Sequence, residues 1–160
     1  MSAVFSRCGR YRYRLERAVG PGITAAYIGV NPSRADATAN DATIRKLIGF
    51  APRHGIGHWL VGNVFAYAAT DISDLRACDN PTGPGNDRHL KAICAEAELI
   101  VLGWGTLGKL PATLRNHHKR VLRIVARSGQ SLHCWGKTQD GQPRHPLMLP
   151  YNSPLIEWTP

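Results

Sequence analysis

The sequence predicts an α/β fold, a three-layer α/β/α sandwich in which helices cover both faces of a short four-stranded parallel sheet. Two observations lead to this prediction. Apolar runs of strand length alternate along the chain with segments whose apolar residues recur at helical spacing. The apolar runs are also continuous, which is typical of parallel strands that are buried on both faces. We therefore expect right-handed crossovers and a ligand site beyond the carboxyl ends of the strands.

Four apolar runs are the predicted strands of this sheet. They are Thr24–Val30, Trp59–Phe65, Leu99–Leu102 and Leu132–Trp135. Before them, the segment Arg10–Val19 has the alternating pattern of an edge strand.

Three segments between the strands have helical periodicity. Asn40 can cap the first, which Pro52 ends; Asn86 opens the second; the third spans about Pro111–Ser128. The chain contains no internal repeat and no linker of low complexity, so residues 1–160 are expected to form a single domain.

The charge balance favours an anionic partner. The 20 Lys and Arg residues outnumber the 11 Asp and Glu residues, so the formal net charge is +9. Such a surplus on a small domain attracts polyanions, and nucleic acid, above all DNA, is the first candidate. Part of the surplus lies in the third helical segment, where Arg120 and Arg123 are candidate contacts to the nucleic-acid backbone. A basic surface that only aids solubility accounts for the charge equally well.

No segment is apolar over the length needed to cross a membrane, so we expect no membrane partner. The first 20 residues carry five arginines and no apolar core of a signal peptide, which predicts a cytoplasmic protein. The four cysteines form no Cys-x-x-Cys pair and are expected to be reduced core residues. Neither a metal ion nor a cofactor is expected.

Polar residues follow the predicted strands where they end. Asn31 precedes a proline, which aims its amide toward the expected pocket, although an Asx turn would use the same residue. Asn63 ends a buried strand, so its amide needs partners, which a ligand edge or the backbone could supply. His145 precedes a second proline near the end of the chain.

Two acids in the loop after Asn31 could activate a water molecule. Asp41 is well placed as a first-turn helix residue, favoured there by the helix dipole, and we prefer that structural role for it. Asp36 has no such structural explanation and is kept as the catalytic candidate.

Three of these segments resemble motifs of the uracil-DNA glycosylase superfamily, in the same order and at the same positions in the sheet. Gly29-Val-Asn-Pro-Ser33 resembles the first motif, Asn63 the base-reading Asn, and His145-Pro-Leu147 the start of the last motif. Over nearly the whole chain, the sequence more closely resembles an uncharacterised bacterial domain family with Asn-Pro-Ser-x-Ala-Asp, Asn-x-Phe-Ala, Trp-Gly and His-Pro-Leu motifs. That closer resemblance implies no activity.

The resemblance to the glycosylases implies a uracil-DNA glycosylase-like fold and hydrolysis of the N-glycosidic bond of a uracil-type, damaged or modified base. It assigns water positioning to Asn31, base recognition to Asn63 and stabilisation of the departing base to His145. Ser33 stands where uracil-selective members carry a Tyr that blocks a methyl group.

Four further residues have roles that such an enzyme would need, although each also fits ordinary packing. Trp104 or Phe65 could stack on an extruded base, and Leu147 with Met148 could wedge into the gap that the base leaves. Leu147 and Met148 stand where the superfamily carries serines that grip phosphate. A hydrolase of free nucleosides or nucleotides and a non-catalytic reader of bases in nucleic acid are therefore the alternative functions.

Overall fold

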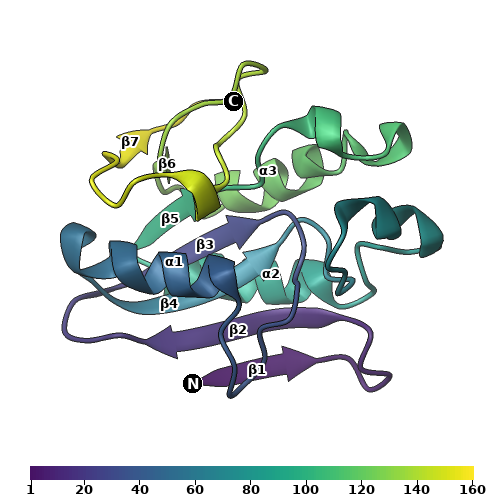
Figure 1. Cartoon of the computed structure of the whole chain (residues 1–160), viewed down its shortest axis with the longest axis horizontal. Helices are drawn as coiled ribbons and strands as arrows, with labels where there is room; N and C mark the ends of the chain where they lie inside the picture. Colours follow the sequence, from purple (N-terminus) through teal and green to yellow (C-terminus); the bar gives the residue numbers. More distant parts are fainter.

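The computed structural model describes all 160 residues and contains one mixed sheet of seven strands, in the order β1-β2-β4-β3-β5-β6-β7 (Figure 1). The strands are β1 (Ser2–Phe5), β2 (Arg12–Ala18), β3 (Ile23–Gly29), β4 (Ile56–Asn63), β5 (Leu99–Leu102), β6 (Leu132–Cys134) and β7 (Ile156–Glu157). The four central strands, β4, β3, β5 and β6, pair in parallel. The three outer strands, β1, β2 and β7, pair antiparallel with their neighbours.

The prediction of a four-stranded parallel sheet is therefore wrong, because the sheet has seven strands and is mixed. The segment predicted as an edge strand, now β2, is covered on its outer side by β1, with Ser2 opposite Glu16. Sequence patterns did not indicate β1 and β7 because both are short and largely exposed. Strands without a buried face leave no hydrophobic periodicity to detect.

Helices cover both faces of the sheet, as the α/β prediction requires. Helix α1 (Ala42–Phe50) lies in front of the sheet in Figure 1, while α2 (Asn86–Glu96) and α3 (His118–Ala126) lie behind it. Alternate residues of β3 point to opposite faces. Tyr27 joins a core of 14 buried residues with α1, whereas Ile28 joins a core of 21 buried residues with α2 and α3.

Two helix starts differ from the predictions. Asp41 caps α1 in place of Asn40, since its Oδ1 accepts a hydrogen bond from the backbone N–H of Ile44 at 2.9 Å. The third helix begins only at His118, because residues 112–114 form a separate 3₁₀ turn. None of the helices combines the length and the apolar character needed to cross a bilayer.

The buried amide of Asn86, at the start of α2, holds the carboxyl end of β4. Its Nδ2 donates hydrogen bonds to the carbonyl oxygens of Asn63, at 3.0 Å, and Val64, at 3.2 Å. Asn86 is fully buried, so water cannot replace it. This contact ties the helix behind the sheet to the strand end from which Asn63 projects.

We predict that Asn86→Ala lowers the free energy of unfolding by about 1–3 kcal/mol, because the carbonyl group of Asn63 loses this buried donor and that of Val64 keeps only Arg120. Chemical denaturation with urea measures this change. Asn116→Ala is the matched control, since Asn116 is exposed and its side chain makes no hydrogen bond, and it should change stability by less than about 0.5 kcal/mol. Equal effects of the two substitutions would contradict the role given to Asn86.

Candidate functional site

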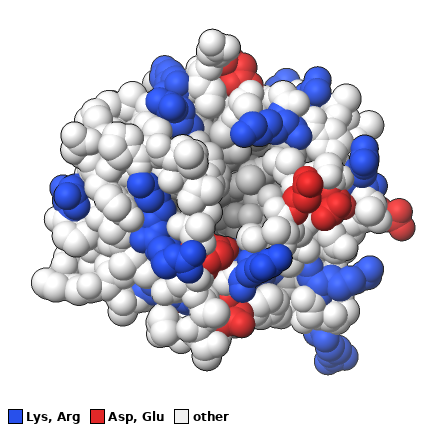
Figure 2. All heavy atoms as spheres, in the orientation of Figure 1, with Lys and Arg blue, Asp and Glu red and all other residues white.

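A cleft opens at the carboxyl edge of the parallel strands. It has a volume of about 390 Å³, and a smaller chamber of about 30 Å³ lies beneath it; we call this the floor chamber. The cleft and the floor chamber share six lining residues, Val30, Asn31, Ser33, Asp41, Thr43 and His145. They therefore form one continuous site, which appears as a hollow with both basic and acidic side chains around its rim (Figure 2).

The parallel pairing of the central strands brings the predicted polar residues together here. Asn31 follows β3, Asn63 ends β4, and His145 lies in the long loop after β6. All three line the floor chamber, and Asn31 and His145 also line the larger cleft. The site is therefore where the rule for ligand sites in parallel sheets places it.

The side chain of Asn31 braces the loops around the cleft. Its Nδ2 donates to the carbonyl oxygen of Ala69, at 2.7 Å, and to that of Pro32, at 3.1 Å. The first of these bonds ties the loop after β3 to the loop after β4. Because both amide hydrogens are occupied in this way, Oδ1 is the polar atom of Asn31 that is left to interact with a ligand or a water molecule.

The side-chain amide of Asn63 has no hydrogen-bond partner in the protein. Only 5% of the residue is exposed, and its Nδ2 is buried. The sequence allowed either the backbone or a ligand to bind this amide, and no backbone group does so. A buried donor without a partner costs about 1–3 kcal/mol, and a water molecule or a ligand atom in the floor chamber would offset this cost. A Cβ on Gly29 would stand 3.0 Å from Asn63 Oδ1, and glycine keeps that space open.

His145 is held as a neutral hydrogen-bond donor. Its Nδ1 accepts a hydrogen bond from the backbone N–H of Leu147 at 3.3 Å, at the start of a 3₁₀ turn. In the neutral ring the proton is then on Nε2, which has no partner in the protein. Burial lowers the pKa of His145, the positive charge of Lys109 lowers it further, and Asp41 opposes both. The ring is thus uncharged at neutral pH.

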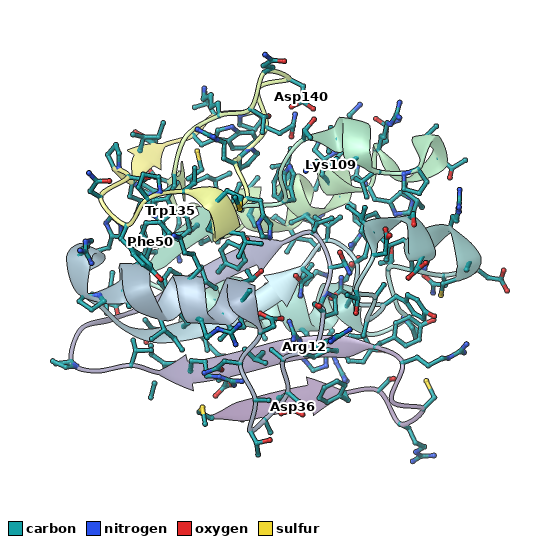
Figure 3. The ribbon with its side chains drawn as sticks, in the orientation of Figure 1. Arg12, Asp36, Phe50, Lys109, Trp135 and Asp140 are labelled. Carbon is teal, nitrogen blue, oxygen red and sulfur yellow. The ribbon has the colours of Figure 1, made fainter.

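The acid in the site is Asp41, and not Asp36. Asp36 lines neither cavity, and its carboxylate accepts hydrogen bonds from the backbone N–H groups of Thr38, at 2.7 Å, and Ala39, at 2.8 Å. These bonds lower the pKa of Asp36 and turn it back onto its own loop, away from Lys109 in Figure 3. Asp41, for which the sequence favoured a structural role, caps α1 and also lines both cavities.

The two aromatic candidates have different positions. Trp104 lines the cleft, and its indole N–H donates to Gln142 Oε1 at 3.0 Å, which fixes the ring at the wall. Phe65 is fully buried beside His117, with 5.3 Å between the ring centroids, and lines neither cavity. Of the two, only Trp104 can contact a ligand in the cleft.

Three smaller candidates lie at or near the mouth of the site. Ser33 lines both the cleft and the floor chamber. Leu147 lines the cleft and is 40% exposed, whereas Met148 is 88% exposed and lies in an adjoining groove. Both apolar side chains are thus available at the rim.

The two predicted backbone contacts on α3 do not reach the site. Arg120 donates to the carbonyl oxygen of Val64 at 2.6 Å and forms an ion pair with Asp87, and burial lowers its pKa. Its role in this structure is to hold the chain after β4. Arg123 is exposed but lines neither cavity. The cation that lines the larger cleft is Lys109.

Sequence reasoning missed two further residues of the site, Arg12 and Lys109. Arg12 lines the floor chamber because β2 lies beside β4, and this pairing could not be read from the alternating pattern of β2 alone. Lys109 follows the predicted Gly-Trp-Gly loop after β5, so its position in a strand-end loop was the signal that could have found it.

The cysteines do not gather at the cleft. Cys94 and Cys134 are buried in the larger core, Cys78 is half-buried, and Cys8 is exposed. No group of three or more His, Cys, Asp or Glu side chains is arranged to hold a metal ion.

A sequence-family model described as "Protein of unknown function (DUF1643)" matches residues 12–147, which include every residue that lines the cleft and its floor chamber. The chain belongs to this family. The expected resemblance to an uncharacterised domain family is thereby confirmed. Searches of curated proteins and of solved structures found no match, so the resemblance of this DUF1643 domain to uracil-DNA glycosylases is not shown.

We predict that His145 titrates below its ordinary pKa of about 6.5, because burial and Lys109 disfavour the charged ring. The unfolded chain then binds the proton more readily than the folded one. The contribution of His145 to stability is therefore complete above pH 6.5 and is lost as the pH falls toward the folded-state pKa. NMR titration, with the signal assigned by His145→Gln, measures this pKa.

Lys109→Gln should raise the pKa of His145, since it removes the second cause of the shift. Asp41→Asn should lower it further, since it removes the opposing charge. A pKa of His145 at or above 6.5 would contradict this prediction, because it would show that burial and Lys109 do not disfavour the charged ring.

Proposed function

We propose that this DUF1643 domain hydrolyses an N-glycosidic bond and releases a nucleobase, with DNA that carries a uracil-type, damaged or modified base as the favoured substrate. One observation carries the proposal: the partnerless amide of Asn63 and the neutral ring of His145 line the same floor chamber. Above it lies a cleft of about 390 Å³, within the usual range for small-ligand sites. A uracil-DNA glycosylase-like arrangement of the strands is part of the same proposal.

The reaction needs groups of opposite character on the two sides of the breaking bond. The sugar develops positive charge as an oxocarbenium-like species, while the departing base becomes anionic. His145 would donate a hydrogen bond to the base from Nε2, which carries the proton of the neutral ring because Nδ1 is the acceptor. Asp41 and the Oδ1 of Asn31 would accept hydrogen bonds from the attacking water, and the negative charge of Asp41 would favour the cationic sugar.

Two alternatives use the same cleft. Hydrolysis of free nucleosides or nucleotides is favoured by one observation: Lys109 is the one basic side chain that lines the larger cleft, which is enough for a single phosphate. A non-catalytic base reader would need Asn63, but it would not need an acid such as Asp41 or a neutral His145 in the cleft. The net charge of +9 and the exposed Leu147 and Met148 at the rim support the nucleic-acid substrate.

The deciding experiment is incubation of the protein with oligonucleotides that each carry one altered base, followed by alkaline cleavage at abasic sites. A parallel series of nucleosides and nucleotides is analysed by chromatography for the released base. Release from oligonucleotides alone supports the DNA substrate, and release from nucleotides alone supports the second function. Binding of oligonucleotides without release of any base supports the reader.

We predict that His145→Ala and Asp41→Asn each lower the single-turnover rate by about a hundredfold to a thousandfold, the usual effect of losing one preorganised group. Binding should change much less, because both groups act mainly on the transition state. Asn can replace Asp as a helix cap, so Asp41→Asn should leave α1 intact. Asp36→Asn is the matched control, since Asp36 lies outside the cleft and its loss should leave the rate unchanged.

The proposed roles fail if folded His145→Ala or Asp41→Asn protein cleaves at the rate of the natural chain. A large loss of rate in Asp36→Asn would also contradict them, because it would place the catalytic acid in the loop and not in the cleft.

We predict that the affinity for DNA falls with salt, with a log–log slope of about 0.9 per phosphate contacted on a duplex. If the cleft is the binding surface, Lys109→Gln should reduce this slope by about one, whereas Arg123→Gln on α3 should leave it unchanged. Fluorescence anisotropy at a series of salt concentrations measures the slope for the natural protein and for each variant. The reverse pattern would place the DNA on α3, and an absence of binding at low salt would favour free nucleosides.

A further inference from the structure

Arg12 is a buried cation with almost no partners. It begins β2, it is 3% exposed, and it lines the floor chamber. Its guanidinium makes a single hydrogen bond, from Nη1 to the carbonyl oxygen of Ala35 at 2.6 Å, and it forms no ion pair. Its Nε is buried without a partner. A buried charge in this condition is unfavourable unless another group compensates it.

Arg17, on the same strand, shows how such a residue is normally satisfied. It is 1% exposed, and every nitrogen of its guanidinium donates a hydrogen bond. The acceptors are Asn40 Oδ1 and the carbonyl oxygens of Glu16, Asp36 and Ala39. Arg17 therefore has a structural role that accounts for all of its donors. Arg12, in contrast, has N–H groups that bind nothing in the protein.

The guanidinium of Arg12 keeps its charge in this position. Burial lowers its pKa to about 10, and the nearby carboxylate of Asp41 limits the decrease. At neutral pH the group is thus still a cation. Asp41 is not close enough to pair with it, and its two oxygens already accept hydrogen bonds from the backbone N–H groups of Ile44 and Ala35.

The second partnerless donor of the floor chamber is Asn63, whose Nδ2 is also buried. The volume of about 30 Å³ leaves room for one or two groups of the size of a water molecule, and not for a ring. A group that satisfies both residues must be small and must accept hydrogen bonds. An exocyclic oxygen on a ring that sits in the cleft above has these properties.

We propose that Arg12 and Asn63 form a subsite that receives an exocyclic oxygen of the base and stabilises negative charge on it. This inference rests on the proposed function. When the bond between the sugar carbon and the base nitrogen breaks, the electron pair moves into the base and is delocalised onto that oxygen. The attacking water gives its hydroxyl group to the sugar carbon, and its second proton ends on the released base.

The subsite selects a chemical class of ligand, namely rings with an oxo group at the inserted edge. An amino group in that place would point its N–H bonds at the N–H bonds of Arg12 and Asn63. Sites built to hydrogen-bond one group reject analogues that leave their buried polar atoms unpaired. We therefore expect the DUF1643 domain to bind oxo bases in preference to the matching amino bases.

The test is calorimetric titration of the full chain with two pairs of free bases, hypoxanthine against adenine and uracil against cytosine. The members of each pair differ by an oxo group in place of an amino group. The natural protein should bind the oxo member of at least one pair about tenfold more tightly or better. Arg12→Met should lose most of this preference, and Arg12→Lys should keep part of it because the charge remains.

Arg14→Met is the matched control, since Arg14 lies on the same strand, pairs with Glu16 and Glu96 and lines neither the floor chamber nor the cleft. It should lower the melting temperature and keep the preference for oxo bases. Asn63→Asp covers the case in which Arg12→Met does not fold. It gives Arg12 a carboxylate partner, so it should raise the melting temperature of the free protein and abolish or reverse the preference.

The outcomes separate this inference from the proposed function. A preference that depends on Arg12, without release of a base from any substrate, supports the subsite and counts against the hydrolase. Hydrolysis by a protein whose Arg12→Met variant keeps the preference overturns the subsite and leaves the hydrolase standing. Equal binding of oxo and amino bases, or no binding of either, also overturns the subsite.

Discussion

The register between β3 and β4 is the constraint on which the site depends. It places Gly29 opposite Asn63, at the carboxyl ends of two parallel strands. Side chains alternate between the faces of a sheet, so a slip of one residue would turn Asn63 toward the core of α2 and α3. That core and the core beneath α1 hold the register, because Ile28 and Tyr27 must each stay on their own side. The position of the amide is therefore a consequence of packing on both faces.

Hydrogen bonds from two arginines of β2 hold the loop after β3. Arg12 donates to the carbonyl oxygen of Ala35, and Arg17 donates to those of Asp36 and Ala39. This arrangement fixes the segment that carries Asn31, Ser33 and Asp41 into the cleft. Two buried arginines thus shape the loop, but only Arg17 uses all of its donors for this purpose. Because Arg12 keeps N–H groups that the loop does not use, it indicates what kind of ligand atom the floor chamber can receive.

Donors without partners lie in the floor chamber, together with the carboxylate of Asp41, which also lines the cleft above. Asn63 and Arg12 offer buried N–H groups without partners, and the neutral ring of His145 offers one further N–H group. The local charges also keep His145 neutral, since burial and Lys109 disfavour its protonation. A site of this character suits a ligand that gains negative charge on one side and positive charge on the other. The cleavage of a base from a sugar has this distribution of charge, and it is the chemical basis of the proposed function.

The sequence by itself determined the α/β class, the four central strands and the meeting of Asn31, Asn63 and His145 at one sheet edge. These follow from local apolar patterns and from the rule that parallel strands end together. Only the tertiary structure decided β1 and β7, the positions of Phe65 and Arg120, and the choice of Asp41 over Asp36 in the cleft. It also decided that Arg12 lies in the floor chamber, through the pairing of β2 with β4. Such placements depend on contacts between segments far apart in the chain, and local periodicity carries no information about them.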